Sequence, residues 1–215
     1  MKISYAITVH NEHEELATLL SVLSEYIRDE DEIVILRDVN ITEEVITVHE
    51  KFEEVLDCEY RHDNEHALNR DFASHKNYLN SLCTGEYIFQ IDADEYPSND
   101  LIEQLPELLA MNPSTDLYLI PRINTVDGLT ADHINRWNWD INDNGWVNFP
   151  DNQSRIYKNT SDIYWINMVH ERIVGYKTYA TLPPMEEYCL FHPKQIARQV
   201  AQNELYAEIA DDCAL

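Results

Sequence analysis

The stretch EYIFQIDADEYPS, residues 86–98, decides the fold. Its apolar run at residues 87–91 is short and rich in β-branched and aromatic residues, which is typical of a buried strand. The strand stops at Asp92, and the Pro-Ser pair that closes the stretch opens an amphipathic helix over residues 99–111. A buried strand, an acidic turn and a helix in this order predict one βα unit of a parallel sheet.

The same order of strand and helix repeats on both sides of this stretch. Further strands are predicted at residues 3–9, 33–36, 58–61 and 116–123, and further helices at residues 13–28, 42–56 and 71–83. Gly85 is expected to end the helix that precedes the central strand. The alternation predicts an α/β fold whose sheet is mainly parallel, with helices on both faces and right-handed crossovers.

The second half of the chain has a different pattern. Residues 124–152 are rich in Asn, Asp and Trp with little periodicity, which is typical of a long functional loop. Short strands, expected to pair antiparallel, are predicted at residues 153–159, 163–168 and 172–180, and a last helix at residues 194–210. The length predicts one domain over residues 1–215, with a small antiparallel C-terminal part.

The composition is acidic, with 40 Asp and Glu against 15 Lys and Arg and a formal net charge of −25. Nucleic acids and anionic membranes are bound by clustered positive charge, so both classes of partner are disfavoured. The acids are concentrated in the first half, and the less acidic second half leaves a local contact with nucleic acid open. Neither a signal peptide nor a run of 18 apolar residues is visible, and the four scattered cysteines favour free thiols, so a cytoplasmic protein is expected.

Glycine is scarce in this chain. Gly85, Gly128, Gly145 and Gly175 lie too far apart to build a G-x-G-x-x-G fingerprint or a Walker A loop. These spacings argue against a Rossmann dinucleotide enzyme and a P-loop NTPase, because both use glycines to bring backbone N–H groups against phosphate. If the protein binds a diphosphate, another group must neutralise it.

Carboxylates collect where the predicted strands end, which is the edge where open α/β sheets bind ligands. Asp92 and Asp94 are two residues apart and point to the same side of an extended chain. Two such carboxylates suit a hard divalent cation, Mg²⁺ or Mn²⁺, which can hold phosphate oxygens in its open positions. The alternative is that both aspartates are turn residues ahead of the helix over residues 99–111.

Four segments together resemble family 2 glycosyltransferases, which have the GT-A fold of nucleotide-sugar transferases. They are ISYAITVHNEHEELATLLSVL, DEIVIL with the following RD, DFASHKNYLNSLCTGEYIFQIDADE, and FPDNQSRIYKN with WINMVHERIVG, and they span residues 3–195. The chain is most similar to small members that resemble bacterial lipopolysaccharide-core β-glucosyltransferases. It departs from the family at the second strand, which runs into Arg37-Asp38-Val39-Asn40, and at His10, where Pro or Ser is usual.

The resemblance implies that residues 1–122 bind the nucleotide-sugar, with UDP as the expected nucleotide, and that residues 123–215 bind the acceptor. It assigns the nucleotide-sugar to Thr8, His10, Asn11, Glu12, Asp38, Lys76, Asn77, Asp92 and Ala93. It implies that Asp94 is the direct ligand of Mn²⁺ or Mg²⁺, with Asp92 and His192 completing the metal site. His192 has the alternative of being an ordinary core histidine, and Asp38 that of a strand-end cap.

The resemblance also implies an inverting transfer in which one carboxylate takes the proton of the acceptor hydroxyl. Glu171 is the first candidate for this base and Asp151 the second, while Glu171 has the alternative of a structural pair with Arg155 or Arg172. Acceptor contacts are expected from Trp137, Trp139, Trp146, Gln153, Arg155 and His170.

A glycan hydroxyl is the acceptor expected for the family, with a protein or a modified nucleic-acid base as alternatives. Two other function classes stay open. An acidic binding protein without catalysis accounts for the charge but not for the set of Asp92, Asp94, Glu171 and His192. A nucleotidyltransferase shares the sheet type and the metal, but it usually needs a Gly-rich N-terminal signature that ISYAITVHNE lacks.

Overall fold

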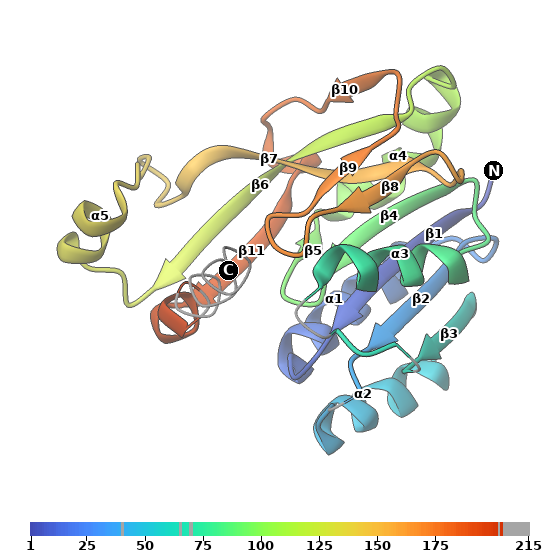
Figure 1. The fold of residues 1–215 in the computed structure, drawn as a ribbon, viewed down its shortest axis with the longest axis horizontal. Coiled ribbons are helices and arrows are strands. Elements are labelled where there is room, and N and C mark those ends of the chain that lie inside the picture. The colour runs from blue at the N-terminus through green and yellow to red at the C-terminus, as the bar shows by residue number, and fades with distance from the viewer. Residues whose placement is uncertain (40, 65, 69–70, 202, 204–215) are drawn as a thin grey trace.

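The computed structural model (Figure 1) describes residues 1–39, 41–64, 66–68, 71–201 and 203. In its first half four strands alternate with four helices: β1 (Ile3–Val9), α1 (His13–Tyr26), β2 (Glu32–Arg37), α2 (Glu43–Glu53), β3 (Glu59–Asp63), α3 (Phe72–Leu82), β4 (Tyr87–Asp92) and α4 (Asn99–Met111). A two-residue strand, β5 (Tyr96–Pro97), lies between β4 and α4. The expected βα alternation is therefore confirmed.

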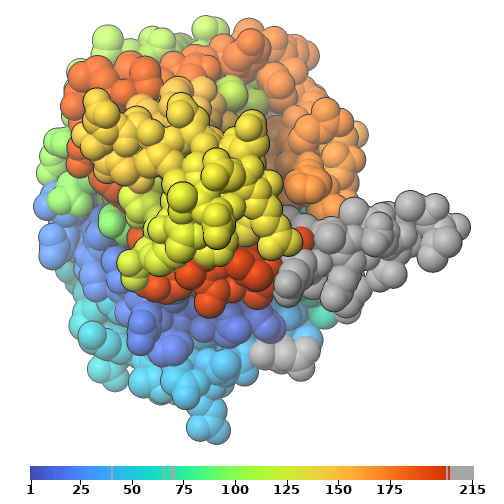
Figure 2. All heavy atoms as spheres, turned by 90° about the vertical axis from the view of Figure 1, so that its left-hand side faces the viewer, coloured from blue at the N-terminus to red at the C-terminus, as the bar shows by residue number. Residues whose placement is uncertain are grey.

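The second half is dominated by two long strands that project beyond the rest of the sheet towards α5 (Figure 1). Its elements are β6 (Leu117–Asp127), α5 (Ala131–Trp137), β7 (Val147–Lys158), β8 (Tyr164–Ile166), β9 (Arg172–Val174), β10 (Tyr179–Thr181), η1 (Glu186–Tyr188) and β11 (Leu190–Gln195). Figure 2 views the molecule from this side and shows the α5 region, in yellow, in front of the red residues near the end of β11.

The main sheet has the order β3-β2-β1-β4-β7-β6-β11-β5, with β10 paired to β6. β1 pairs in parallel with both β2 and β4, and β2 with β3, as expected. β7 is antiparallel to β4 and to β6 and lies between them, so β4 and β6 do not pair with each other. The reason is that β7 returns from the excursion through α5, and a returning strand that pairs with β6 must run antiparallel to it.

Apolar side chains cover both faces of the sheet. α1, α2 and α4 pack on one face, where Leu19 and Leu105 are fully buried. α3 packs on the other face together with the antiparallel pair β8–β9, and its Leu79 lies in one apolar cluster with Trp165. The expected helices on both faces are confirmed, and a hairpin shares the second face with α3.

Two predicted segments differ from the structure. Residues 124–152 are not one long loop, because they contain the end of β6, α5 and the start of β7. The strand expected over residues 172–180 is broken into β9 and β10 at Gly175, where φ is +89°. A Cβ at Gly175 would lie 1.7 Å from the carbonyl oxygen of Asp162, so only glycine allows the chain to turn there.

Gly85 does not end the preceding helix as expected. The capping residue of α3 is Cys83, which is extended. A Cβ at Gly85 would lie 2.7 Å from the backbone nitrogen of Ser4, so the missing side chain lets the chain enter β4 close against β1. The last helix begins at Ile196 rather than at residue 194, because residues 190–195 form β11, and its predicted remainder lies mostly outside the described residues.

Cys58, Cys83 and Cys189 are buried free thiols, as expected, and Cys213 lies outside the described residues. Over the part of the chain that the structure describes, no helix is both long enough and apolar enough to cross a membrane.

A buried carboxylate ties β2 to the start of β4, and it carries a testable prediction. Glu32 is fully buried and accepts hydrogen bonds from the hydroxyls of Ser4 (2.5 Å) and Thr84 (2.8 Å) and from Arg61 (2.7 Å). Burial alone would raise the pKa of Glu32, but the hydrogen bonds from Lys2, Ser4 and Thr84 outweigh it and lower that pKa to about 2.

Because this pKa is below the unfolded value, the stabilisation by Glu32 is complete above about pH 5 and is lost as the pH falls towards 2. We expect Glu32→Gln to lower the free energy of unfolding at pH 7 by up to about 3 kcal/mol. The difference from the wild type should shrink steadily below pH 5. Urea unfolding at several pH values between 7 and 3 measures this, and a difference that does not change with pH would contradict the prediction.

Candidate active site

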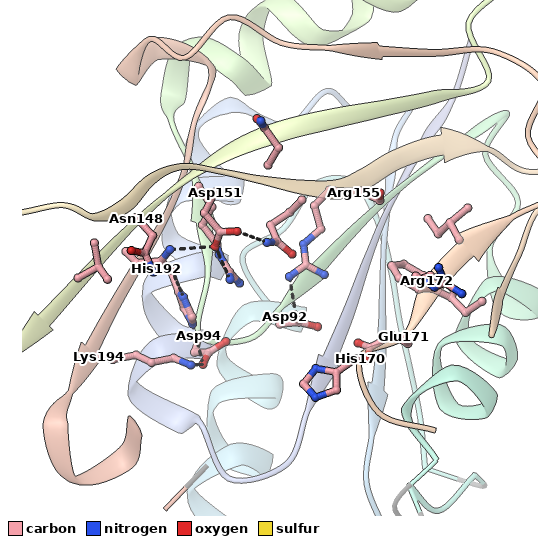
Figure 3. Close-up of a pocket in the computed structure, with 18 of the residues that line it drawn as sticks. Asp92, Asp94, Asn148, Asp151, Arg155, His170, Glu171, Arg172, His192 and Lys194 are labelled. Carbon is pink, nitrogen blue, oxygen red and sulfur yellow. Dashed lines mark hydrogen bonds and ion pairs between the residues drawn. The ribbon is translucent and has the colours of Figure 1, made fainter. Parts of the chain in front are cut away.

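A cavity of about 960 Å³ opens at the carboxyl end of β4, between β7, β9 and β11 (Figure 3). Nine of the predicted site residues line it: Asp92, Asp94, Trp139, Asp151, Gln153, Arg155, His170, Glu171 and His192. These residues come from segments up to a hundred positions apart, and only the sheet order brings them together. The cavity is the candidate active site.

Asp92 is the last residue of β4 and lies in register with Thr8 of β1. The hydroxyl of Thr8 is 3.2 Å from the Asp92 carboxylate. The same carboxylate accepts a hydrogen bond of 2.6 Å from the Arg155 guanidinium and forms an ion pair with Lys76 Nζ at 3.2 Å. Burial by itself would raise the pKa of Asp92, but Arg155 and Lys76 outweigh it and hold that pKa well below its usual range. Asp92 is therefore ionised and already neutralised by two protein cations.

Asp94 follows in the turn after β4 and faces His192 of β11, whose Nε2 lies 3.3 Å from the Asp94 carboxylate. Asn124 fixes the tautomer of this histidine. Its amide nitrogen donates to Asp151 (2.9 Å), so its carbonyl oxygen faces His192 Nδ1 (2.7 Å), which must carry the proton. In the neutral imidazole the lone pair of Nε2 is then directed at Asp94.

The protonation states favour a cation between these two groups. Burial would raise the pKa of Asp94, but its contact with His192 and the charge of Lys194 outweigh it, so the carboxyl is ionised. Burial lowers the pKa of His192 despite the nearby Asp94, so the ring is neutral at pH 7. Two electron-pair donors that face each other are stabilised by a metal ion between them. Two protein cations near Asp94, Arg198 Nη2 at 3.5 Å and Lys194 Nζ at 3.8 Å, offer partial compensation.

Among the described residues no group of three or more His, Cys, Asp and Glu side chains is arranged to hold a metal ion. Asp94 and His192 fit an ion that takes its remaining ligands from the substrate phosphates and water. An imidazole together with a carboxylate suits Mn²⁺ better than Mg²⁺, which prefers oxygen ligands throughout. Asp92 fits a direct metal contact less well, because both of its oxygens already contact cations.

Glu171 lies just before β9, at the side of the cavity opposite His192 (Figure 3). Its Oε1 accepts a hydrogen bond of 2.7 Å from Lys76, so the cation beside Glu171 is Lys76 and not the Arg155 or Arg172 considered from the sequence. Lys76 is buried beneath the cavity, where its Nζ lies 4.8 Å from the ring of Trp165. The ammonium group therefore bridges Glu171 and Asp92.

The loop that carries Glu171 has an unusual backbone. Asn167 and His170 have positive φ angles of 75° and 52°, a region that non-glycine residues visit rarely. Such conformations persist where surrounding structure imposes them, and they are concentrated at functional sites. The loop places His170 and Glu171 side by side at the cavity.

Asp151 is held by several donors. Arg122 reaches its Oδ2 with two nitrogens, at 2.7 and 3.0 Å, and Asn124 and Gln153 donate as well. Burial would raise the pKa of Asp151, but these contacts, with Arg122 the largest, lower it. A carboxylate that accepts four hydrogen bonds has little capacity left to take a proton, so the geometry favours Glu171 over Asp151 as a base.

Sequence reasoning missed Arg122 and Asn124, and it missed a further member of this network, Glu95. It is almost fully buried (1% exposed) and accepts hydrogen bonds of 2.6 Å from both Arg122 and Arg155. Glu95 thereby joins the arginine that holds Asp151 to the arginine that holds Asp92. The only signal in the sequence is its place as the last acid of the DADE run.

A second polar cluster lies at the carboxyl ends of β1 and β2, outside the cavity lining. Asp38 accepts hydrogen bonds from the backbone nitrogens of Val39 (2.8 Å) and Leu68 (3.1 Å) and pairs with His10 at 3.1 Å. Burial would raise the pKa of Asp38, but these contacts lower it. Glu12 accepts from the backbone nitrogens of His10 and Asn11, which rigidifies the turn after β1.

Most of the remaining predicted residues make structural contacts outside the cavity. The side-chain amide of Asn77 donates to the backbone oxygen of Trp165 and accepts from its backbone nitrogen, both at 2.8 Å. These bonds tie β8 to α3, and Asn77 does not face the cavity. Ala93 donates its backbone N–H to Thr8. Of the three tryptophans predicted to contact the acceptor, only Trp139 lines the cavity, while Trp137 packs on Trp139 and Trp146 packs on Phe149.

A mainly parallel sheet with helices on both faces is the arrangement of the GT-A class of transferases, so the expected fold is confirmed. The model of the family described as Glycosyl transferase family 2 matches residues 4–174. The chain belongs to glycosyl transferase family 2. No curated protein sequence matches this chain.

Solved structures with a similar fold have low sequence identity. TarS of S. aureus, residues 1–349, is 15% identical with a TM-score of 0.63, and the match covers 90% of this chain and 60% of that chain. The same TarS fragment in complex with UDP-GlcNAc is 16% identical with a TM-score of 0.57, over 87% and 60% of the two chains. This chain therefore spans about 60% of the length of the fragment that it matches.

Proposed function

We propose that this chain is a metal-dependent inverting glycosyltransferase that moves a sugar from a nucleoside diphosphate donor to a hydroxyl group. The observation that supports this best is the pair of Asp94 and neutral His192 facing Glu171 across one cavity. Residues 1–122 form the donor half and residues 123–215 the acceptor half in this proposal. Family membership supports the reaction class.

The donor is proposed to be a UDP-sugar. Asp38, placed at the carboxyl end of β2 with His10 beside it, is suited to accept the N–H of a uracil ring. TarS, which has a similar fold, has been solved with UDP-GlcNAc, and this supports a uridine nucleotide. The scarcity of glycine agrees with a site where a metal ion and cations, instead of a backbone nest, face the diphosphate.

Asp94 and His192 would hold the metal ion, Mn²⁺ in preference to Mg²⁺. When bound, this ion supplies positive charge against the diphosphate leaving group. Lys194, beside Asp94, adds a protein cation at the same end of the cavity. Because this positive charge stabilises the leaving diphosphate, no carboxylic acid is needed to protonate it.

Glu171 is proposed to take the proton of the acceptor hydroxyl. Its Oε1 accepts a hydrogen bond from Lys76, which leaves Oε2 to receive the proton while the ammonium group keeps the carboxylate oriented. The acceptor oxygen then attacks from the face opposite the diphosphate, which inverts the anomeric configuration. A glycan hydroxyl is the proposed acceptor, with Trp139 as an aromatic contact.

The donor and metal assignments are tested by binding of UDP. We expect Mn²⁺ to tighten UDP binding by tenfold or more, and Asp94→Asn to remove about this gain because the metal loses its carboxylate. Isothermal titration of UDP with and without Mn²⁺ measures both effects. Asp100→Asn, an exposed aspartate in the first turn of α4, is the matched control and should bind UDP normally.

If UDP binds equally well with and without Mn²⁺, the proposed metal dependence is wrong. If neither UDP nor any UDP-sugar binds, the donor assignment is wrong. If Asp94→Asn retains the full effect of Mn²⁺, the metal lies elsewhere in the chain.

A further inference from the structure

One continuous segment of the chain, Glu171–Tyr176, lines the cavity with all six of its residues. β8 holds it in place, because Ile166 pairs with Arg172 at the start of β9. The turn at Gly175 then directs Tyr176 to the same cavity. This wall therefore presents a carboxylate, a guanidinium, two aliphatic side chains and an aromatic ring in sequence.

Arg172 differs from the other cations that line the cavity. Arg122 lies 2.7 Å from Asp151, Arg155 lies 2.6 Å from Asp92, and Lys194 lies 3.8 Å from Asp94. Among the residues that the structure describes, Arg172 has neither an ion pair nor a hydrogen bond from its side chain, which is exposed. In a chain with 40 acids and 15 Lys and Arg, an arginine without a carboxylate partner in an active-site cavity points to a ligand that supplies the negative charge.

The position of Arg172 separates it from the proposed diphosphate site. Figure 3 shows Asp94, His192 and Lys194 on one side of Asp92, and Glu171 and Arg172 on the other. On the proposed function, on which this inference rests, the donor phosphates lie at the Asp94 side and the acceptor hydroxyl lies at Glu171. Arg172 is therefore on the acceptor side.

Tyr176 supplies a surface for the rest of such a ligand. Its side chain is 37% exposed and lines the cavity, and its ring packs edge-on against Tyr179 at 6.2 Å. An aromatic ring that lines a cavity and is held in this way can pack on the apolar face of a sugar ring.

We propose that the acceptor is a sugar that carries an anionic group, a phosphate or a carboxylate, and that Arg172 binds this group. A guanidinium matches both anions with two parallel N–H donors, and the charge makes these hydrogen bonds strong. Tyr176 supports the sugar ring, and the bound anion orients the acceptor hydroxyl towards the adjacent Glu171. The net charge of −25 repels anions at long range. The positive charge of Arg172 supplies the local attraction that lets an anionic acceptor bind.

Binding of three small probes tests the proposal: glucose, glucose 6-phosphate and glucuronate. Saturation-transfer NMR with the full chain, in the presence of UDP and Mg²⁺, gives the affinity of each probe for three proteins. These are the wild type, Arg172→Gln, and the control Lys177→Gln, which removes the same unit of charge from an exposed side chain that does not line the cavity. The phosphate and carboxylate probes distinguish the two anionic groups.

We expect the wild type and Lys177→Gln to bind at least one anionic probe about tenfold more tightly than glucose, and Arg172→Gln to lose this preference. The proposal is overturned if glucose binds as well as both anionic probes, if neither anionic probe binds, or if Arg172→Gln keeps the preference. UDP affinity measured on the same samples tests the donor site separately. The anion preference is scored whether or not UDP binds, so failure of one assignment is distinguishable from failure of the other.

Discussion

Replacing Glu171 by glutamine should lower the rate of sugar transfer by a factor of about 10²–10⁴, the range that loss of a general base produces. Glutamine has nearly the same shape, and its carbonyl oxygen can still accept the hydrogen bond from Lys76, so the local structure should persist. UDP affinity should therefore be unchanged, because Glu171 lies on the side of Asp92 away from Asp94 and His192. The measurement is UDP release from the UDP-sugar that gives turnover, together with titration of UDP.

Asp151→Asn provides the comparison that decides which carboxylate is the base. Asp151 accepts hydrogen bonds from Arg122, Asn124 and Gln153, so its substitution should disturb these side chains and lower both stability and activity. If Glu171→Gln costs less than tenfold in turnover while Asp151→Asn abolishes turnover without loss of stability, Asp151 is the base and the assignment of Glu171 is wrong.

The second large effect is expected at Glu95, which does not line the cavity. Its carboxylate is the common acceptor for Arg122 and Arg155, and it is almost completely buried. Glu95→Gln removes the negative charge and leaves two guanidinium groups facing each other with less compensation. We expect the free energy of unfolding to fall by about 3–5 kcal/mol, as when one partner of a buried ion pair is removed.

Urea unfolding followed by circular dichroism measures this loss. Glu103→Gln, an exposed glutamate on α4, is the matched control and should change stability by less than about 0.5 kcal/mol. A loss below about 1 kcal/mol for Glu95→Gln would show that Asp92 and Asp151 alone stabilise the two arginines. Both partners remain in the network, at 2.6 Å from Arg155 and 2.7 Å from Arg122.

Much of the fold follows from local sequence patterns. The four βα units of the first half could be predicted because each short strand and each amphipathic helix is encoded within about ten neighbouring residues. The insertion of β7 between β4 and β6 could not be predicted in this way. Beyond Ile123, β6 lacks an apolar pattern, and its pairing depends on β7 and β11, which follow later in the chain.

The residue types of the candidate site were also recognisable from the sequence, since Asp92, Asp94 and Glu171 stand in motifs at strand ends. Their partners do not follow from the local pattern, and His192 is placed beside Asp94 only by the family resemblance. Lys76 meets Glu171 across 95 positions, and His192 meets Asp94 across 98. No periodicity extends over such separations, so the sequence around Glu171 offers only Arg155 and Arg172 as alternative partners.

The sequence alone determined that this chain builds an acidic, glycine-poor α/β domain with carboxylates at the ends of parallel strands, because these features depend on composition and short-range periodicity. Only the tertiary structure decided what each carboxylate does. Asp92 is neutralised by Lys76 and Arg155, Asp94 faces His192, and Asp151 is enclosed by hydrogen-bond donors. The chemistry of a carboxylate depends on the charges and donors within a few ångströms of it, and folding alone determines those neighbours.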